Sequence, residues 1–265
     1  MPVSFISETE LPGRVINLDT LKIIAHRYYW VSQYVSGKKV LEVGCGPALG
    51  LGYLSKISAI YVGGDITRAS LQQARDYYGT RSKLVGMDAH HLPFKDKSFD
   101  VIVCVAAVIY LELPLFLNEC RRLLQPDGQL LINTPNKHIP DFQPSVLSRR
   151  YYSVPELSSL FSNHGFHADF FGAFIVPAPI RRRLQKLVSS LMSLGTKCLS
   201  GLHLDTGIKK FLMKKKVNVV LKNEIDKTDI LLTQDIPIVP VPSSKLDKEH
   251  RIIYVLARLG QDNHK

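Results

Sequence analysis

The sequence lacks any apolar run of the roughly 20 residues that a transmembrane helix needs, which excludes a conventional spanning segment. Its first ten residues contain two acids and no apolar core, so we expect no secretory signal. Cysteine is scarce, with four among 265 residues and no C-x-x-C pair. That spacing argues against a structural zinc site and favours a reducing, cytoplasmic location.

Acidic residues are scarce in one segment in particular. Residues 177–227 hold twelve Lys and Arg but three acids, a net charge of +9 within a chain whose total is +11. The rest is therefore close to neutral, and its apolar content is that of an ordinary globular protein. A basic segment on a balanced domain indicates a surface suited to an anionic partner.

A short apolar run followed by two glycines is the feature around which the chain is organised. Residues 40–43 predict a buried strand, Gly44 and Gly46 follow at once, and apolar periodicity from Leu49 predicts a helix. Because glycine has no Cβ, backbone N–H groups in such a turn can approach a ligand closely. The dinucleotide pattern G-x-G-x-x-G fails at Leu49, and Glu42 inside the strand favours a ligand with an ammonium group over a phosphate.

Two further acids follow predicted strands. Asp65 ends the strand predicted over 59–66 and stands 19 positions after Gly46, which is close to the spacing of a ribose-binding acid. The alternative is that Asp65 only caps the helix predicted over 68–78. Asp88 follows a short strand predicted over 83–86. Parallel strands end at one edge of a sheet, so we expect these acids to share a cleft with Glu42.

Four blocks together resemble the class I S-adenosylmethionine (SAM) dependent methyltransferases of the methyltransferase type 11 group: E-V-G-C-G, G-M-D-A, S-F-D-V-I-V and E-C-R-R-L-L-Q-P-D-G. In the last block Asp127 replaces the family's first glycine, a change that turn geometry tolerates. The resemblance implies a Rossmann-like three-layer α/β sandwich with a seven-stranded, mostly parallel sheet and an antiparallel terminal strand. It also implies SAM as cofactor, S-adenosylhomocysteine as product, and no metal.

The resemblance assigns roles to residues near the predicted strand ends. Glu42 would act at the amine of SAM directly or through water, Asp65 would face the ribose and Asp88 the adenine. Arg27 and Tyr28, on a helix predicted over 18–35, either meet the carboxylate of SAM or only pack that helix onto the sheet. The complete predicted cofactor set is Arg27, Tyr28, Glu42, Gly44, Cys45, Gly46, Asp65, Ile66, Asp88, Ala89 and Val105. His90 and His91 are interpreted as surface histidines.

Tyr110 and His138 are the predicted catalytic residues. Tyr110 follows the strand predicted over 101–105 and either transfers a proton or only forms a wall of the pocket. His138 lies in T-P-N-K-H, which resembles a loop of methyltransferases from sugar- and polysaccharide-modifying systems. It is the predicted general base because the unperturbed pKa of histidine lies near working pH. Asn136, Lys137 and Tyr152 are further predicted acceptor-side residues.

We expect three parts in the chain. Residues 1–176 form the SAM-binding core with an N-terminal helical cover, 177–242 a basic helical insert or lid, and 243–265 the last strand of the core. One face of the insert's predicted helix, 180–191, is apolar, and basic clusters lie at 181–186 and 209–216. The insert either covers the active site and contacts the acceptor, attaches peripherally to an anionic membrane surface, or is a solvated face without a partner.

Three functions remain open from the sequence. The first is O-methylation of a small molecule, a sugar or glycan, or a lipid-linked acceptor. The second is methylation of RNA or another nucleic acid through the basic insert, although V-A-A-V-I-Y stands where enzymes acting on base amines carry an N-P-P-Y type motif. The third is a non-catalytic SAM-fold module, which the retention of Glu42, Asp65 and Asp88 disfavours.

Overall fold

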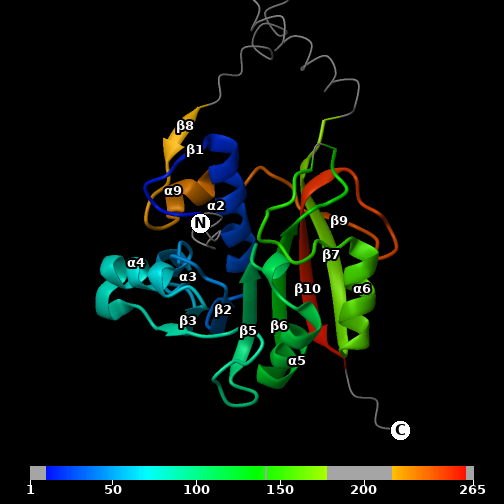
Figure 1. Cartoon of the computed structure of the whole chain (residues 1–265), viewed down its shortest axis with the longest axis horizontal. Coiled ribbons are helices and arrows are strands. Elements are labelled where there is room, and N and C mark those ends of the chain that lie inside the picture. Colours follow the sequence, from blue (N-terminus) through cyan, green and yellow to red (C-terminus); the bar gives the residue numbers. More distant parts are fainter. Residues whose placement is uncertain (1–9, 141, 178–216, 261–265) are drawn as a thin grey trace, which may run out of the picture.

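The computed structural model describes residues 10–140, 142–177 and 217–260 (Figure 1). Its strands are β1 (Val15–Asn17), β2 (Lys39–Val43), β3 (Ile60–Asp65), β4 (Leu84–Gly86), β5 (Phe99–Val105), β6 (Leu124–Pro135), β7 (Phe166–Ile175), β8 (Asn218–Val220), β9 (Val239–Pro240) and β10 (His250–Leu259). Its α-helices are α2 (Leu18–Ser32), α3 (Leu51–Leu54), α4 (Arg68–Tyr78), α5 (Leu113–Leu123), α6 (Val154–Asn163) and α9 (Lys227–Leu231).

The main sheet has the order β4-β3-β2-β5-β6-β10-β7-β9. The strands from β4 to β6 pair in parallel, and β10 pairs antiparallel with β6 and β7. A mixed sheet with an antiparallel last strand is therefore confirmed, but the predicted count of seven strands is wrong. The two-residue strand β9 adds an eighth at the edge beside β7. Pro240 has no N–H to donate, and a proline of this kind is tolerated at a sheet edge.

Alternate residues of the central strands face two different layers of helices. Val40 on β2 packs in one apolar cluster with residues of α2, α3 and α4, whereas Leu41 packs in a second cluster with residues of α5 and α6. Val103 and Ile102 on β5 divide in the same way. Because successive side chains of a strand point to opposite faces, continuous apolar strands produce a sheet buried on both sides. The result is the predicted three-layer α/β sandwich.

Helix α2 covers the sheet on the side of the glycine turn. It begins after Asn17, whose side chain accepts a hydrogen bond from the Thr20 N–H at 2.8 Å and caps the helix. The fully buried His26 joins it to two other segments, with Nδ1 2.6 Å from the Tyr254 hydroxyl and Nε2 3.2 Å from the Ile236 carbonyl oxygen. Burial lowers the pKa of His26, so this contact is made by a neutral imidazole.

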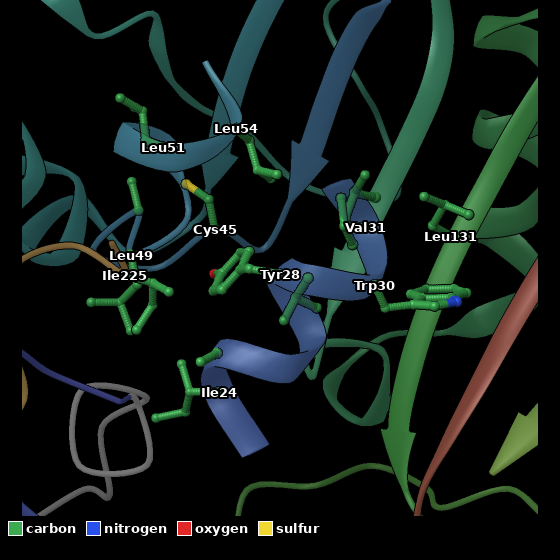
Figure 2. Close-up of a cluster of buried hydrophobic side chains, with 14 of the residues drawn as sticks. Ile24, Tyr28, Trp30, Val31, Cys45, Leu49, Leu51, Leu54, Leu131 and Ile225 are labelled. Atoms are coloured by element: carbon green, nitrogen blue, oxygen red, sulfur yellow. The ribbon is translucent and has the colours of Figure 1, made fainter. Parts of the chain in front are cut away.

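Residues 217–238 fold back onto this side of the molecule, before the chain continues to β9 at the far edge of the main sheet. β8 pairs with β1 in a separate two-stranded sheet, and α9 packs against α2 (Figure 1). Ile225 is fully buried beside the glycine turn, and its N–H donates to the Leu49 carbonyl at 2.8 Å (Figure 2). The predicted helix over 180–191 and both basic clusters lie outside the described residues. In the described part of the chain, no helix combines the length and apolarity needed to cross a bilayer.

Candidate functional site

A cavity of about 430 Å³ opens at the carboxyl ends of β2, β3 and β5. This is the edge of a parallel sheet at which ligands bind in doubly wound folds. Every residue of the predicted cofactor set except Glu42 lines it: Arg27, Tyr28, Gly44, Cys45, Gly46, Asp65, Ile66, Asp88, Ala89 and Val105. Asp65 and Asp88, which follow two different strands, therefore lie in one cleft, as expected.

The glycine turn has a backbone that only glycine adopts without strain. Gly44 has φ +75° and Gly46 has φ +54°. The N–H groups of Gly44 and Cys45 donate to the Gly64 carbonyl at 2.8 and 3.0 Å, which fixes the turn against the end of β3. A Cβ on Gly44 would lie 2.5 Å from the Cβ of Ala107, which also lines the cavity. The turn is therefore held tightly and leaves no room for a side chain.

Replacing Gly44 with alanine should destabilise the protein by about 2–3 kcal/mol, because the left-handed backbone and the clash with Ala107 both oppose it. Urea denaturation measures this change. The matched control is Gly37→Ala, where φ is +68° but nothing lies within 4 Å of the new Cβ. If both variants lose equal stability, the close approach at Gly44 contributes nothing beyond backbone strain.

Asp65 is oriented by the backbone around it. Its Oδ2 accepts from the Gly46 N–H at 2.8 Å, and its Oδ1 accepts from the Thr67 N–H at 2.7 Å. Each carboxylate oxygen can accept a further hydrogen bond, since an ionised carboxylate offers about four acceptor sites. The alternative role, a cap on α4, is wrong: the N-cap of α4 is Thr67, and Asp65 accepts from the N–H of that residue in the turn before the helix. Asp65 thus joins the glycine turn to the start of α4 and still presents acceptors to the cavity.

Asp88 is paired with His90, which also lines the cavity. Asp88 Oδ1 accepts from the His90 N–H at 2.9 Å and lies 2.8 Å from Nδ1 of the same histidine. The backbone hydrogen bond is the largest cause that lowers the pKa of Asp88. His90 Nε2 accepts from the Glu112 N–H at 3.0 Å, so Nδ1 carries the ring hydrogen. Both ring nitrogens are therefore engaged, and His90 orients Asp88 rather than offering a free base.

Glu42 lies elsewhere than predicted. It is fully buried and does not line the cavity. Its carboxyl accepts hydrogen bonds from the hydroxyls of Tyr28, at 3.2 Å, and Tyr61. Burial raises the pKa of Glu42 to about 8. Burial therefore favours the protonated form of Glu42, and the Tyr28 side chain lies between this carboxyl and the cavity.

Arg27 and Tyr28 reach the cavity from α2. Figure 2 shows the Tyr28 ring extending from α2 toward Cys45 and Leu49. Arg27 is only 6% exposed, and its Nη1 lies 3.0 Å from Glu10 Oε1. Its Nε is buried and has no hydrogen-bond partner among the residues that the structure describes. Because Tyr28 also packs in the apolar cluster, the cofactor and packing interpretations both describe its position.

Only one of the two predicted catalytic residues lies at the cavity. Tyr110 lines the cavity at the end of β5, beside Ile109 and Leu111. His138 does not line it; its backbone N–H donates to Asn136 Oδ1 at 2.9 Å, and its Nε2 is buried without a partner. The geometry therefore gives no support to His138 as the general base and retains Tyr110.

The other predicted acceptor-side residues are held in structural contacts away from the cavity lining. Asn136 Nδ2 donates to the Asp247 carboxylate at 3.1 Å and to the His250 carbonyl at 2.8 Å. Lys137 pairs with Glu156 at 2.6 Å. Tyr152 is buried, and the central guanidinium carbon of Arg150 lies 5.0 Å from the centroid of the Tyr152 ring. These contacts join the loop after β6 to β10 and α6.

Four polar residues of the cavity were not predicted as site residues: Glu10, Thr67, His90 and Arg149. Glu10 precedes the first regular element, where the sequence has no periodicity to place it. His90 differs from the surface interpretation, whereas the side chain of His91 is 85% exposed, as expected. Arg149 forms an ion pair with Glu112 at the cavity, and its loop carries no motif that identifies it.

Comparisons with known proteins agree on one family. Residues 41–132 match the model of the methyltransferase domain Methyltransf_11. A phthiotriol/phenolphthiotriol dimycocerosates methyltransferase from Mycobacterium ulcerans is 38% identical over 119 residues, which is 41% of this chain and 42% of that protein. A fatty-acid O-methyltransferase from Mycolicibacterium smegmatis is 36% identical over 115 residues, again 41% of this chain and 42% of that protein. The chain thus spans less than half the length of these curated relatives.

The fold itself extends beyond the matched segment. The crystal structure of a SAM-dependent methyltransferase from Thermotoga maritima superimposes with a TM-score of 0.57 at 15% identity, over 91% of this chain and 90% of that one. At that identity the likeness shows the fold alone.

Proposed function

Because this chain carries the methyltransferase domain of the class I SAM-dependent family, we propose that it methylates an oxygen atom of a small or lipid-linked acceptor with SAM. The observation that carries the proposal is one cavity with two kinds of wall. One part holds the glycine turn, Asp65 and Asp88, and the other holds Ile109, Tyr110 and Leu111.

The residues of the first part fit SAM chemically. The Gly44 turn provides a wall without a side chain, and Asp65 provides acceptors for hydroxyl groups. Asp88 stays ionised beside His90 and can accept from an amino group, while Arg27 has a buried donor without a partner. When bound, SAM supplies a methyl group that its sulfonium already makes electrophilic. The protein's task is then chiefly to align the acceptor.

Tyr110 is the residue we propose to face the acceptor. Tyr110 lines the apolar part of the cavity. There a hydroxyl group of the acceptor would be desolvated, and its proton would need a hydrogen-bonding partner. His90 does not serve this purpose, because its nitrogens are occupied by Asp88 and the Glu112 N–H.

Replacing Tyr110 with phenylalanine should lower kcat about 100-fold while leaving the dissociation constant of SAM unchanged, since the ring remains and the hydroxyl is removed. Steady-state kinetics and calorimetry on the same variant separate the two effects. His138→Gln is the control outside the cavity and should retain wild-type kcat. An unchanged kcat in Tyr110→Phe would reduce Tyr110 to a wall of the pocket.

The apolar part of the cavity and the names of the relatives support a lipid-like acceptor. Ile109, Leu111 and Pro135 contribute carbon surface there, with the Arg149–Glu112 pair beside it. The relatives cited above are named for a fatty acid and for a lipid of the dimycocerosate type. We extend that acceptor class to this chain, and we assign the basic insert to contact with the acceptor or with the anionic surface that carries it.

Transfer of tritium from methyl-labelled SAM tests the proposal. The panel contains free fatty acids, hydroxylated lipids, sugars and total RNA, and it is repeated at 50 and 300 mM salt. We expect label on a lipid hydroxyl or carboxyl and none on RNA. Salt-sensitive labelling of RNA would replace this function with nucleic-acid methylation. Stoichiometric SAM binding without transfer to any class would favour a non-catalytic module.

A further inference from the structure

The amino-acid end of SAM carries a carboxylate and an ammonium group, so a complementary site needs a cation and an anion close together. Arg27 is the buried cation of the cavity. The question is which carboxylate lies on the same side. The following inference rests on the proposed function, since it concerns how the cavity would hold SAM.

Glu42 does not meet this requirement. Both of its oxygens accept hydrogen bonds from tyrosine hydroxyls, it is fully buried, and it lies outside the cavity lining. Burial also raises the pKa of this carboxyl and so disfavours the negative charge that an ammonium group would need. An ammonium group in the cavity would meet the Tyr28 side chain first.

Glu10 does meet it. Glu10 lines the cavity, and one oxygen of its carboxylate lies 3.0 Å from Arg27 Nη1. Its side chain is 37% exposed, so the carboxylate is not sealed away from a ligand. Asp65 and Asp88, the other carboxylates of the lining, project from the ends of β3 and β4 and are engaged by Gly46, Thr67 and His90.

The position of Glu10 is set by the segment that follows it. The Gly13 N–H donates to the Leu221 carbonyl at 2.8 Å, and the Leu221 N–H donates back to the Arg14 carbonyl at 2.9 Å. β1 then pairs with β8 over Val15–Asn17. The chain leading to Glu10 is thus fixed to residues 217–221, next to α2, which carries Arg27.

Arg27 retains hydrogen-bonding capacity beyond this pair. It is more than nine-tenths buried, and within residues 10–140, 142–177 and 217–260 its Nε has no partner. A guanidinium offers five N–H donors in a planar fork suited to a carboxylate. The Arg27–Glu10 pair therefore presents opposite charges side by side, which is the arrangement that a bound zwitterion requires.

We propose that Glu10 binds the ammonium group of the cofactor while Arg27 binds its carboxylate. From the sequence, the ammonium-binding role was predicted for Glu42. In this arrangement Glu42 instead supports the site from behind, through the hydroxyl of Tyr28.

The test measures calorimetric binding of three probes to the wild-type chain and to Glu10→Gln. The probes are S-adenosylhomocysteine, decarboxylated SAM, which keeps the amine, and 5′-methylthioadenosine, which lacks the whole amino-acid end. We expect Glu10→Gln to weaken the first two roughly tenfold, because the amide oxygen can still accept but the attraction between carboxylate and ammonium is lost. The third should change less than about twofold.

Glu249→Gln is the control, since it removes one negative charge from an exposed glutamate that does not line the cavity. It should bind all three probes as the wild type does. Unchanged or tighter binding of S-adenosylhomocysteine to Glu10→Gln would overturn the inference, tighter binding showing that Glu10 competes for Arg27. Failure of the wild type to bind any of the probes would instead overturn the proposed function.

Discussion

Replacing Asp65 with alanine should weaken the binding of S-adenosylhomocysteine about 100-fold. The carboxylate lies in the cavity with its orientation fixed by the Gly46 and Thr67 N–H groups. In the proposed site it accepts from two ribose hydroxyls, and hydrogen bonds to a charged group contribute about 1.5–3 kcal/mol each. Loss of both at the lower figure corresponds to roughly two orders of magnitude in the dissociation constant, which isothermal titration calorimetry measures.

The same substitution also removes the contacts between Asp65 and the glycine turn, so two further variants separate the effects. Asp65→Asn keeps the side-chain shape and one acceptor, and it should bind with intermediate affinity. Asp169→Ala removes an exposed carboxylate on β7, which is paired with Arg258 and lies outside the cavity lining, and should bind normally. A wild-type dissociation constant for Asp65→Ala would remove this residue from the site.

Replacing Glu42 with glutamine should change how stability depends on pH. The folded-state pKa of Glu42 is raised to about 8 from an ordinary value of 4.5 by burial. Between these two values the unfolded chain has lost the proton that the folded chain keeps. The free energy of unfolding of the wild type therefore falls by about 1.4 kcal/mol per pH unit from this group. The stabilisation is fully present below pH 4.5 and is lost as pH rises toward 8.

Urea denaturation at pH 5, 6.5 and 8 measures this slope. Glutamine does not titrate, so Glu42→Gln should be about 4 kcal/mol more stable relative to the wild type at pH 8 than at pH 5. Glu249→Gln, at an exposed position, should follow the wild-type profile. Parallel profiles for the wild type and Glu42→Gln would mean that Glu42 is ionised in the folded protein, and the argument against it as an amine ligand would fail.

Much of the fold could be predicted from local patterns because its central strands are short, apolar and punctuated by glycine and acids. The helix predicted over 68–78 matches α4, and the strand ends at Val43 and Val105 are as predicted. The helix predicted from Leu49 after the glycine turn is the four-residue α3, which begins two residues later at Leu51. Strands β1 and β8 were missed because two three-residue segments about 200 residues apart stabilise each other only after the chain has folded.

The site was predictable as far as it depends on strand ends. Asp65 and Asp88 follow from topology, because parallel strands deliver their carboxyl ends to one edge. Glu42 shows where that reasoning stops. On a strand it shares a face with Val40, which α2 covers, so its side chain meets Tyr28 instead of the cavity. Glu10 could not be found from spacing, since its contact with Arg27 depends on the pairing of β1 with β8.

The central claim is that the cavity at the ends of β2, β3 and β5 binds a sulfonium nucleoside. The most direct measurement is a calorimetric titration of the wild-type chain with S-adenosylhomocysteine. We predict saturable binding with one site per chain and a dissociation constant in the micromolar range. Absence of saturable heat at ligand concentrations on the order of 1 mM would contradict the assignment.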